Sequence, residues 1–148
     1  MKEKHIKMRI LVTGVCGQLG HDVVNEAIAR GHDVMGSDLQ PSYSGISDGS
    51  SVSTCRYVSL DITDYYSVIS VITEIRPDVI VHCAAWTAVD LAEEEGNLEK
   101  VDRINHLGAK YIAEVAKAVD AKMLYISTDY VFDRNYEIKR MIGWVDCI

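Results

Sequence analysis

The sequence predicts an α/β fold in which a doubly wound parallel sheet carries helices on both faces. Five short apolar runs typical of buried strands occur along the chain, and three of the four segments between them are expected to be helices. The connections between successive runs are too long for hairpins, so neighbouring strands are expected to run parallel. A chain of 148 residues, 48% of them apolar and 25% charged, has the size and composition of one globular domain.

The amino-terminal part supplies the first two strands and the helix between them. Residues 9–12 (R-I-L-V) form a short apolar run that ends at Thr13-Gly14, as a buried parallel strand does. A helix is expected over 18–30, where apolar positions recur at helical spacing before a glycine stop. Those positions are Leu19, Val23, Ala27 and Ile28. A second strand is expected over 33–37, and the serine- and glycine-rich stretch 40–54 is expected to be a mobile loop.

The rest of the chain continues the same alternation. Strands are expected over 56–60, 78–83 and 122–127. The first two are joined by a helix that Thr63 or Asp64 caps and that ends at Ile75, before Pro77. A long helix is expected over most of 98–119. Its apolar face consists of Ile104, Leu107, Tyr111, Ile112 and Val115.

Charge, cysteines and the amino terminus exclude several classes of protein. The formal net charge of −7 speaks against a nucleic-acid partner, because no cationic surplus is available to displace counterions from phosphates. Four cysteines lie far apart with no C-x-x-C pair, so neither a metal site nor a disulfide framework is expected. The polar start M-K-E-K-H-I-K-M-R and the lack of a long apolar run predict a cytoplasmic protein without a membrane span.

A glycine-rich loop stands between the first strand and the first helix. It reads T-G-V-C-G-Q-L-G, with glycine at positions 14, 17 and 20. In this context Gly14 makes the tight turn off the strand, Gly17 lets the backbone approach a pyrophosphate, and Gly20 lets helix and strand pack closely. The following helix offers free N–H groups and a positive dipole end to phosphates. The loop predicts a Rossmann-type dinucleotide-binding fold; a purely structural turn is the alternative.

Acidic residues after two strands bear on the choice of cofactor. Asp38 ends the second strand, where an acidic residue binds the adenosine ribose, and a carboxylate there repels a 2′-phosphate and favours NADH. A loop-capping role is the alternative for Asp38. Asp61 and Ile62 follow the third strand and are placed to hold the adenine edge. From spacing alone, capping of the next turn is equally expected of Asp61.

Three motifs in order resemble one family. They are the glycine loop, H-C-A-A-W-T-A-V-D-L-A-E-E-E after the fourth strand, and I-S-T-D-Y-V-F-D after the fifth. Together they resemble the dTDP-4-dehydrorhamnose reductase family of extended short-chain dehydrogenases/reductases, over nearly all of 9–133. The resemblance implies reduction of the 4-keto group of dTDP-4-dehydro-L-rhamnose by NADH or NADPH, which gives dTDP-L-rhamnose.

The resemblance also implies roles for individual residues. Residues expected to contact the pyrophosphate are Gly14, Gly17, Gln18, Leu19 and Gly20. The resemblance strengthens the adenine assignment of Asp61 and Ile62. Residues expected on the nicotinamide side are Ala84, Ala85, Trp86 and Thr87, with Asn105 packing near the site. Thr128 is expected to help polarise the ketone.

Three positions near these motifs carry other expectations. Trp86, taken alone, would more often be a core or interface residue. His82 ends a buried strand and is expected to be a satisfied core histidine. Leu91 stands where the family usually carries lysine, which weakens any substrate or phosphate contact assigned there.

The sequence does not contain the proton donor that the expected reaction requires. Ketone reduction needs a proton donor beside the hydride donor, and in this family the donor is the tyrosine of a Y-x-x-x-K pair. The nearest imitation is Tyr136 with Lys139 and Arg140, where lysine comes one position early, and arginine does not replace it. We therefore expect an NAD(P)-binding domain over 1–133 and an irregular tail over 134–148. The chain is expected to be truncated before the last strand and the substrate lobe, and inactive alone.

Two further expectations concern partners and function. An uncovered edge of a truncated sheet favours a homo-oligomer or a partner chain that covers it. The alternative function is a non-catalytic dinucleotide-binding or regulatory subunit that resembles the regulatory subunit of methionine adenosyltransferase. The missing Tyr/Lys pair is the feature that separates the two functions.

Overall fold

The structure, a computed structural model, describes residues 6–92, 94 and 96–126. Its strands are β1 (Arg9–Thr13), β2 (Asp33–Asp38), β3 (Arg56–Ser59), β4 (Val79–His82) and β5 (Lys122–Tyr125). They form one sheet in the order β3-β2-β1-β4-β5, and every neighbouring pair is parallel. The predicted parallel sheet is confirmed, with β1 at its centre.

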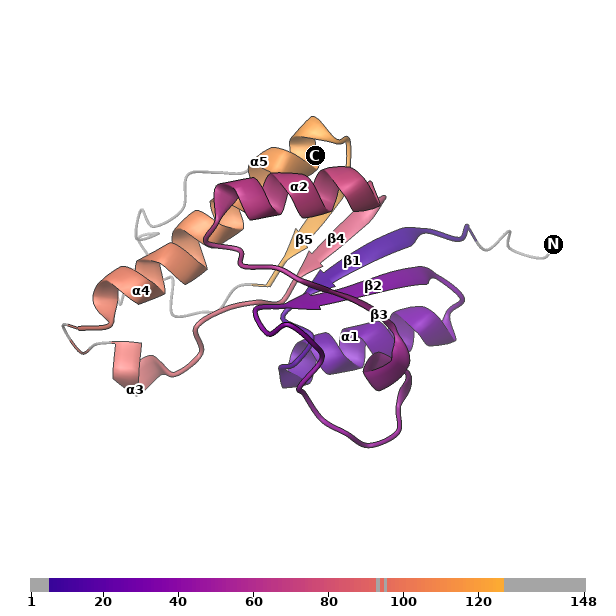
Figure 1. The fold of residues 1–148 in the computed structure, drawn as a ribbon, viewed down its shortest axis with the longest axis horizontal. Helices are drawn as coiled ribbons and strands as arrows, with labels where there is room; N and C mark the ends of the chain where they lie inside the picture. The colour runs from indigo at the N-terminus through magenta and orange to yellow at the C-terminus, as the bar shows by residue number, and fades with distance from the viewer. Residues whose placement is uncertain (1–5, 93, 95, 127–148) are drawn as a thin grey trace, which may run out of the picture.

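Helices cover both faces of the sheet, as the alternation of elements predicts. Helix α1 (Gln18–Ala29) lies on one face, and α2 (Tyr65–Ile75) and α5 (Ala109–Ala118) lie on the other (Figure 1). Helix α2 begins after Asp64, whose side chain accepts a hydrogen bond of 3.0 Å from the N–H of Tyr66, so the predicted cap is confirmed. No helix within the described ranges is long and apolar enough to cross a membrane.

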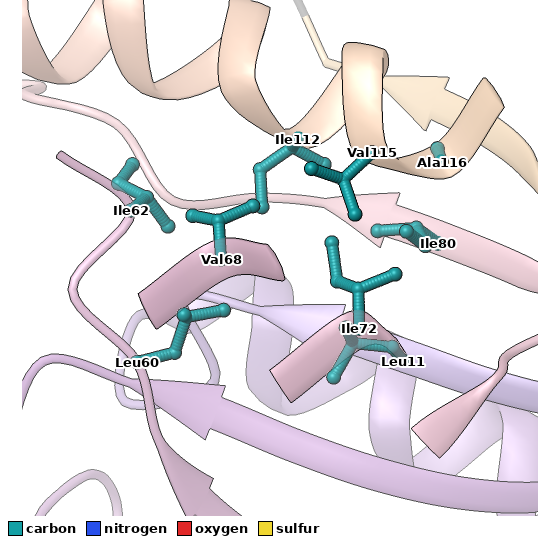
Figure 2. Packing of buried hydrophobic residues seen from close by; sticks show 9 residues of the cluster. All are labelled: Leu11, Leu60, Ile62, Val68, Ile72, Ile80, Ile112, Val115 and Ala116. Carbon is teal, nitrogen blue, oxygen red and sulfur yellow. The ribbon is translucent and has the colours of Figure 1, made fainter. Parts of the chain in front are cut away.

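The core has two layers, one on each face of the sheet. On the α1 face, Val24 packs with Val12 and other strand residues. On the opposite face, Ile112 and Val115 of α5 point toward Val68 and Ile72 of α2 (Figure 2). Because successive residues of a strand point to opposite faces, a strand covered on both sides must be apolar throughout. This explains the uninterrupted apolar run that predicts β1.

The helix expected over 98–119 is not one continuous α-helix. Helix α4 (Leu98–Asp102) leads into a π-helical segment, η2 (Arg103–Gly108), and only then into α5; a short helix, α3 (Val89–Ala92), precedes them. A Cβ atom on Gly108 would lie 2.8 Å from Cδ1 of the Ile62 side chain, so glycine lets this wide turn pack closely on the loop after β3. The expectation of a single α-helix is therefore corrected: its middle part is a π-helical turn.

The segment between β2 and β3, residues 39–55, is named here the strap. It runs past α1 and ends in a 3-10 turn, η1 (Ser51–Thr54), before the chain returns to β3 (Figure 1). Val52 is only 1% exposed and joins the core on the α1 face, and its N–H donates 2.9 Å to Oδ1 of Asn25. The expected loop over 40–54 is present, and Val52 and its amide anchor the carboxyl-terminal part of it to the core and to α1.

Candidate functional site

The candidate site lies at the carboxyl ends of the parallel strands. Sheet order reverses between β1 and β4, because the chain adds β2 and β3 on one side and β4 and β5 on the other. In open parallel sheets, ligands bind outside the carboxyl ends of the strands at such a switch point. The loops after β1, β3 and β4 carry the residues that the motifs single out.

Two glycines of the loop after β1 are required by the fold itself. Gly14 has a φ of +74°, and a Cβ atom on it would lie 2.6 Å from the backbone nitrogen of Ala84. Gly14 therefore brings the glycine loop against the loop after β4. A Cβ atom on Gly20 would lie 2.7 Å from the carbonyl carbon of Gly14, so Gly20 lets α1 start directly against the turn.

Gly17 has no such reason to be glycine. Its φ of −83° and ψ of 165° are open to any residue, and the nearest atom to an added Cβ would be the oxygen of Gly14 at 3.4 Å. Gly17 is exposed, and it is the cap residue of α1, with no side-chain hydrogen bond at that cap. The backbone here is bare where the positive end of the helix dipole would favour an anion.

Asp38 is tied into this loop by two backbone donors. Its Oδ2 accepts 2.9 Å from the N–H of Cys16, and its Oδ1 accepts 2.8 Å from the N–H of Leu39. The loop-capping role is therefore present. A carboxylate has further lone pairs, so the same group, half-buried beside the glycine loop, retains acceptor capacity for a ribose hydroxyl.

The side chains of Asp61 and Ile62 also make contacts within the fold. Asp61 Oδ1 accepts from the N–H and the hydroxyl of Thr63 at 2.9 and 2.7 Å, so the predicted turn cap is formed. Ile62 is 8% exposed and packs on Gly108. Any adenine contact would therefore use the backbone or the remaining lone pairs of Asp61.

Asn105 fixes the backbone of the loop after β4. Its Oδ1 accepts 2.7 Å from the N–H of Trp86, and its Nδ2 donates 3.2 Å to the oxygen of Trp86. The main-chain oxygen of Asn105 accepts 3.2 Å from the hydroxyl of Tyr125 at the end of β5. Asn105 thus holds the loop after β4 in place instead of facing open space. Ala85 and Thr87 are exposed, and Trp86 is half-buried with its indole donating 2.9 Å to the oxygen of Ala88.

His82 is the buried polar residue at the switch point. It is 1% exposed, its Nδ1 lies 2.8 Å from the hydroxyl oxygen of Thr13, and its ring stacks on Tyr125 at 5.6 Å between centroids. Burial lowers the pKa of His82 to about 4, so the imidazole is neutral at pH 7. The predicted core position is confirmed, although Nε2 has no hydrogen-bond partner among the described residues.

The structure brings most of the predicted residues together. Gly14 of the glycine loop approaches the backbone of Ala84. Within η2, Asn105 binds the backbone of Trp86 and Gly108 contacts Ile62. Asp38 accepts a hydrogen bond from Cys16. Thr128, Tyr136 and the tail over 134–148 lie outside the described residues. Within the described ranges, no group of acidic, histidine and cysteine side chains is arranged to hold a metal ion.

His21 is a polar residue of this region that the motifs do not reveal. It follows Gly20, is 7% exposed and makes hydrogen bonds to α1 and to the strap. A histidine in the first turn of a helix gives no signal by itself. Its partners Asp48 and Ser50 lie 27 and 29 positions further on, in a stretch without periodicity.

The parallel sheet and the glycine loop together identify the chain as a Rossmann-type α/β domain. Comparison with known families narrows this further. The chain belongs to the family described as RmlD substrate binding domain, whose model matches residues 8–142.

Relatives with known names agree with this family. The chain is 39% identical over 124 residues to a protein named dTDP-4-dehydrorhamnose reductase from Streptomyces griseus, a match that covers 84% of this chain and 34% of that protein. It is 33% identical over 125 residues to methionine adenosyltransferase 2 subunit beta from Xenopus laevis, with the same two coverages of 84% and 34%. The chain thus spans about a third of the length of these relatives.

Solved structures show the same fold. A crystal structure of dTDP-4-dehydrorhamnose reductase from Bacillus anthracis in complex with NADP matches at a TM-score of 0.68 and 38% identity, over 86% of this chain and 38% of that one. The enzyme WbmG from Bordetella bronchiseptica, in complex with NAD, matches at a TM-score of 0.72 over 90% of this chain and 42% of that one. At 21% identity, this second match concerns the fold alone.

Proposed function

We propose that this chain forms the dinucleotide-binding part of an NAD(P)H-dependent reductase of a nucleotide-activated 4-keto sugar. The observation that carries the proposal is Gly17, a glycine that neither backbone conformation nor packing requires. Its lack of a side chain leaves the amino terminus of α1 open to a pyrophosphate. The residues present therefore fit a dinucleotide.

The other predicted contacts follow from the same placement. Residues 18–20 of the first turn of α1 would donate N–H groups to the phosphates, and Asp38 would accept from the adenosine ribose. The backbone of 84–87, held by Asn105, would line the nicotinamide side. When bound, the reduced cofactor supplies the hydride. We further propose that Asp38 favours NADH, although a relative was solved with NADP.

The proposed substrate is dTDP-4-dehydro-L-rhamnose and the product dTDP-L-rhamnose. Support comes from the names of relatives at 39% and 34% identity. Thr128 is proposed to help polarise the ketone. None of the eight tyrosines of the chain has lysine four positions later, so the expected proton donor has no counterpart here. We therefore propose that these 148 residues bind the cofactor without completing the reaction.

A second candidate is a dinucleotide-binding subunit without turnover. The match to methionine adenosyltransferase 2 subunit beta covers the same 84% of the chain as the reductase match, and its identity of 33% is close to that of the reductases. Cofactor binding is expected of both candidates. Turnover of the keto sugar by the protein in its natural length distinguishes them.

The proposal is tested by titrating NADH and NADPH into the chain by calorimetry. Gly17→Ala should weaken NADH binding about tenfold or more, because its methyl group occupies the pyrophosphate approach. The melting temperature should stay within a few degrees, because φ and ψ at Gly17 suit alanine. Gly96→Ala is the matched control, since a Cβ there meets nothing within 4 Å.

Three outcomes of this titration would count against the proposal. A well-folded chain that binds neither dinucleotide would refute the function. Equal losses in Gly17→Ala and Gly96→Ala would remove Gly17 from the site. Equal affinity for NADH and NADPH would remove the ribose role of Asp38.

A further inference from the structure

His21 connects the first turn of α1 to the strap through both of its ring nitrogens. Nδ1 lies 2.9 Å from Oδ1 of Asp22 on the same helix, and Nε2 lies 3.1 Å from Oδ2 of Asp48 in the strap. The hydroxyl oxygen of Ser50 is also 3.1 Å from Nε2, and the amide of Asn25 is 3.4 Å away. One buried ring thus joins two elements that are far apart in the sequence.

The groups that face the two ring nitrogens indicate the protonation state of His21. A carboxylate is only an acceptor, so a nitrogen facing a carboxylate oxygen must carry a proton to make a hydrogen bond. Both nitrogens of His21 face carboxylates, Asp22 on one side and Asp48 on the other. A neutral imidazole can satisfy one of them, and the imidazolium satisfies both. The contacts with Asp22 and Asp48 are therefore complete at the same time only when His21 is protonated. In the neutral ring with its proton on Nδ1, the contact with Asp48 is lost and Nε2 keeps only the hydroxyl of Ser50 as a donor from the strap.

The strap held by His21 lies directly against the glycine loop. The N–H and hydroxyl of Ser44 approach the sulfur of Cys16 at 3.4 and 3.6 Å. A Cβ atom on Gly45 would lie 2.9 Å from Cα of Cys16, so the two backbones touch. Cys16 stands between Gly14 and Gly17, and its own N–H binds Asp38. A shift of the strap would therefore reach the turn on which the pyrophosphate is proposed to rest.

We propose that His21 is a positioning residue of the dinucleotide site: as imidazolium it ties the strap to α1 and so holds the strap-side wall of the glycine loop. This inference rests on the proposed function, because it assigns a role relative to the same cofactor. It assigns His21 an indirect role, through the strap from Asp48 to Ser44 and from there to Cys16. The affinity for NADH should consequently depend on pH.

The direction of this dependence follows from the ring and its partners. Hydrogen bonding to Asp22, and then to Asp48, raises the pKa of His21 above its ordinary value, against the opposing effect of burial. Hydrogen bonds from Ser50 lower the pKa of Asp48 to about 2, so this carboxylate stays ionised at any pH of interest. A raised histidine pKa means that the connection is present at low pH and is lost as pH rises through that pKa.

The test measures the dissociation constant of NADH between about pH 5.5 and 8.5 in the chain and three variants. The unmodified chain should bind about two- to fivefold more weakly at the alkaline end, the range expected for a partly exposed ion pair. His21→Gln and Asp48→Asn should bind at this weaker level at both ends. Asp22→Asn, the matched control, leaves the strap contact and lets a neutral ring with its proton on Nε2 satisfy Asp48. It should therefore keep tight binding at low pH and lose most of the weakening at high pH.

Asp48→Asn also excludes the simplest rival explanation. If the charge of His21 acted directly on the phosphates, removing the negative charge of Asp48 would leave NADH binding unchanged or strengthen it. That result would overturn the proposal, as would NADH binding without pH dependence in the unmodified chain. A second measurement needs no cofactor: proteolytic cleavage within 39–50 should accelerate at high pH and in Asp48→Asn at low pH. A chain with this cleavage pattern but no NADH binding would contradict the proposed function and leave the strap connection standing.

Discussion

His82 and Thr13 form a buried polar pair at the ends of β4 and β1. Thr13 is 1% exposed, and its hydroxyl oxygen also accepts 3.3 Å from the N–H of Ala84. The pair therefore links two central strands to the loop after β4. Because burial at this place removes water from the ring and disfavours its charged form, His82 is neutral in the folded state.

The neutral state of His82 predicts that the free energy of unfolding decreases at acidic pH. The pKa of His82 is about 4 in the fold against an ordinary 6.5, so the unfolded chain binds the extra proton first as pH falls. Stability should be full above about pH 6.5 and should fall toward pH 4, by up to about 3 kcal/mol. Urea unfolding at a series of pH values measures this loss. His82→Asn, which can still meet the hydroxyl of Thr13, should lose less between pH 7 and 4.5; an identical slope in both chains would contradict the assignment.

Residues differ in how far their roles can be predicted from sequence. The burial of His82 is predictable, because it ends an apolar strand. Gly14 and Gly20 are predictable from the loop, and the structure supplies the reason, since their neighbours leave no space for a side chain. His21 is not predictable, because its partners lie in a stretch whose path depends on burial of Val52.

At the scale of elements, η2 joins the structures around the candidate site. Its wide turn presents the main-chain oxygen of Asn105 to Tyr125, its Asn105 side chain to the backbone of Trp86, and Gly108 to Ile62. π-helical turns are frequent at functional sites because they reorient groups within a helix. The sequence predicts helix over 98–119, but one widened turn leaves the apolar spacing almost unchanged. Only the contacts of Asn105 and Gly108 reveal it.

Tyr125→Phe tests how much this junction contributes. The substitution leaves the oxygen of Asn105 without its side-chain donor in a half-buried place, and should cost about 1 kcal/mol of unfolding free energy. Tyr66→Phe is the matched control, because Tyr66 is 81% exposed and should change stability by less than about 0.5 kcal/mol. Denaturant unfolding of both variants measures the difference. Equal effects would show that the Tyr125 hydroxyl contributes nothing to η2.

At the scale of the whole molecule, strand alternation alone predicts the parallel sheet and its two layers. It also predicts which ends of the strands carry the site, because carboxyl ends of parallel strands share an edge. The order of the three motifs predicts the family, and the family match over 8–142 confirms this prediction. The anchoring of the strap to the core and the π-helical turn η2 are missed for one common reason. Both are shaped by contacts between segments distant in sequence, and local periodicity does not record such contacts.

Among the described residues, two apolar side chains at the end of β5 are exposed, which predicts self-association. Leu124 pairs in register with Val81, whose side chain belongs to the core on the α1 face, so both point to that face. Helix α1 packs on β1 and β2, and no helix among the described residues covers this face of β5, which leaves Leu124 55% and Ile126 40% exposed. An edge strand with exposed apolar side chains favours association with another chain.

Sedimentation velocity at several protein concentrations should therefore show species larger than a monomer. Leu124→Lys should shift the distribution toward monomer, because a charged side chain on an edge strand opposes pairing. Leu98→Lys is the matched control: Leu98 is also 55% exposed but lies on α4, away from the edge. If the unmodified chain sediments as a monomer at every concentration, the apolar face of β5 does not drive association.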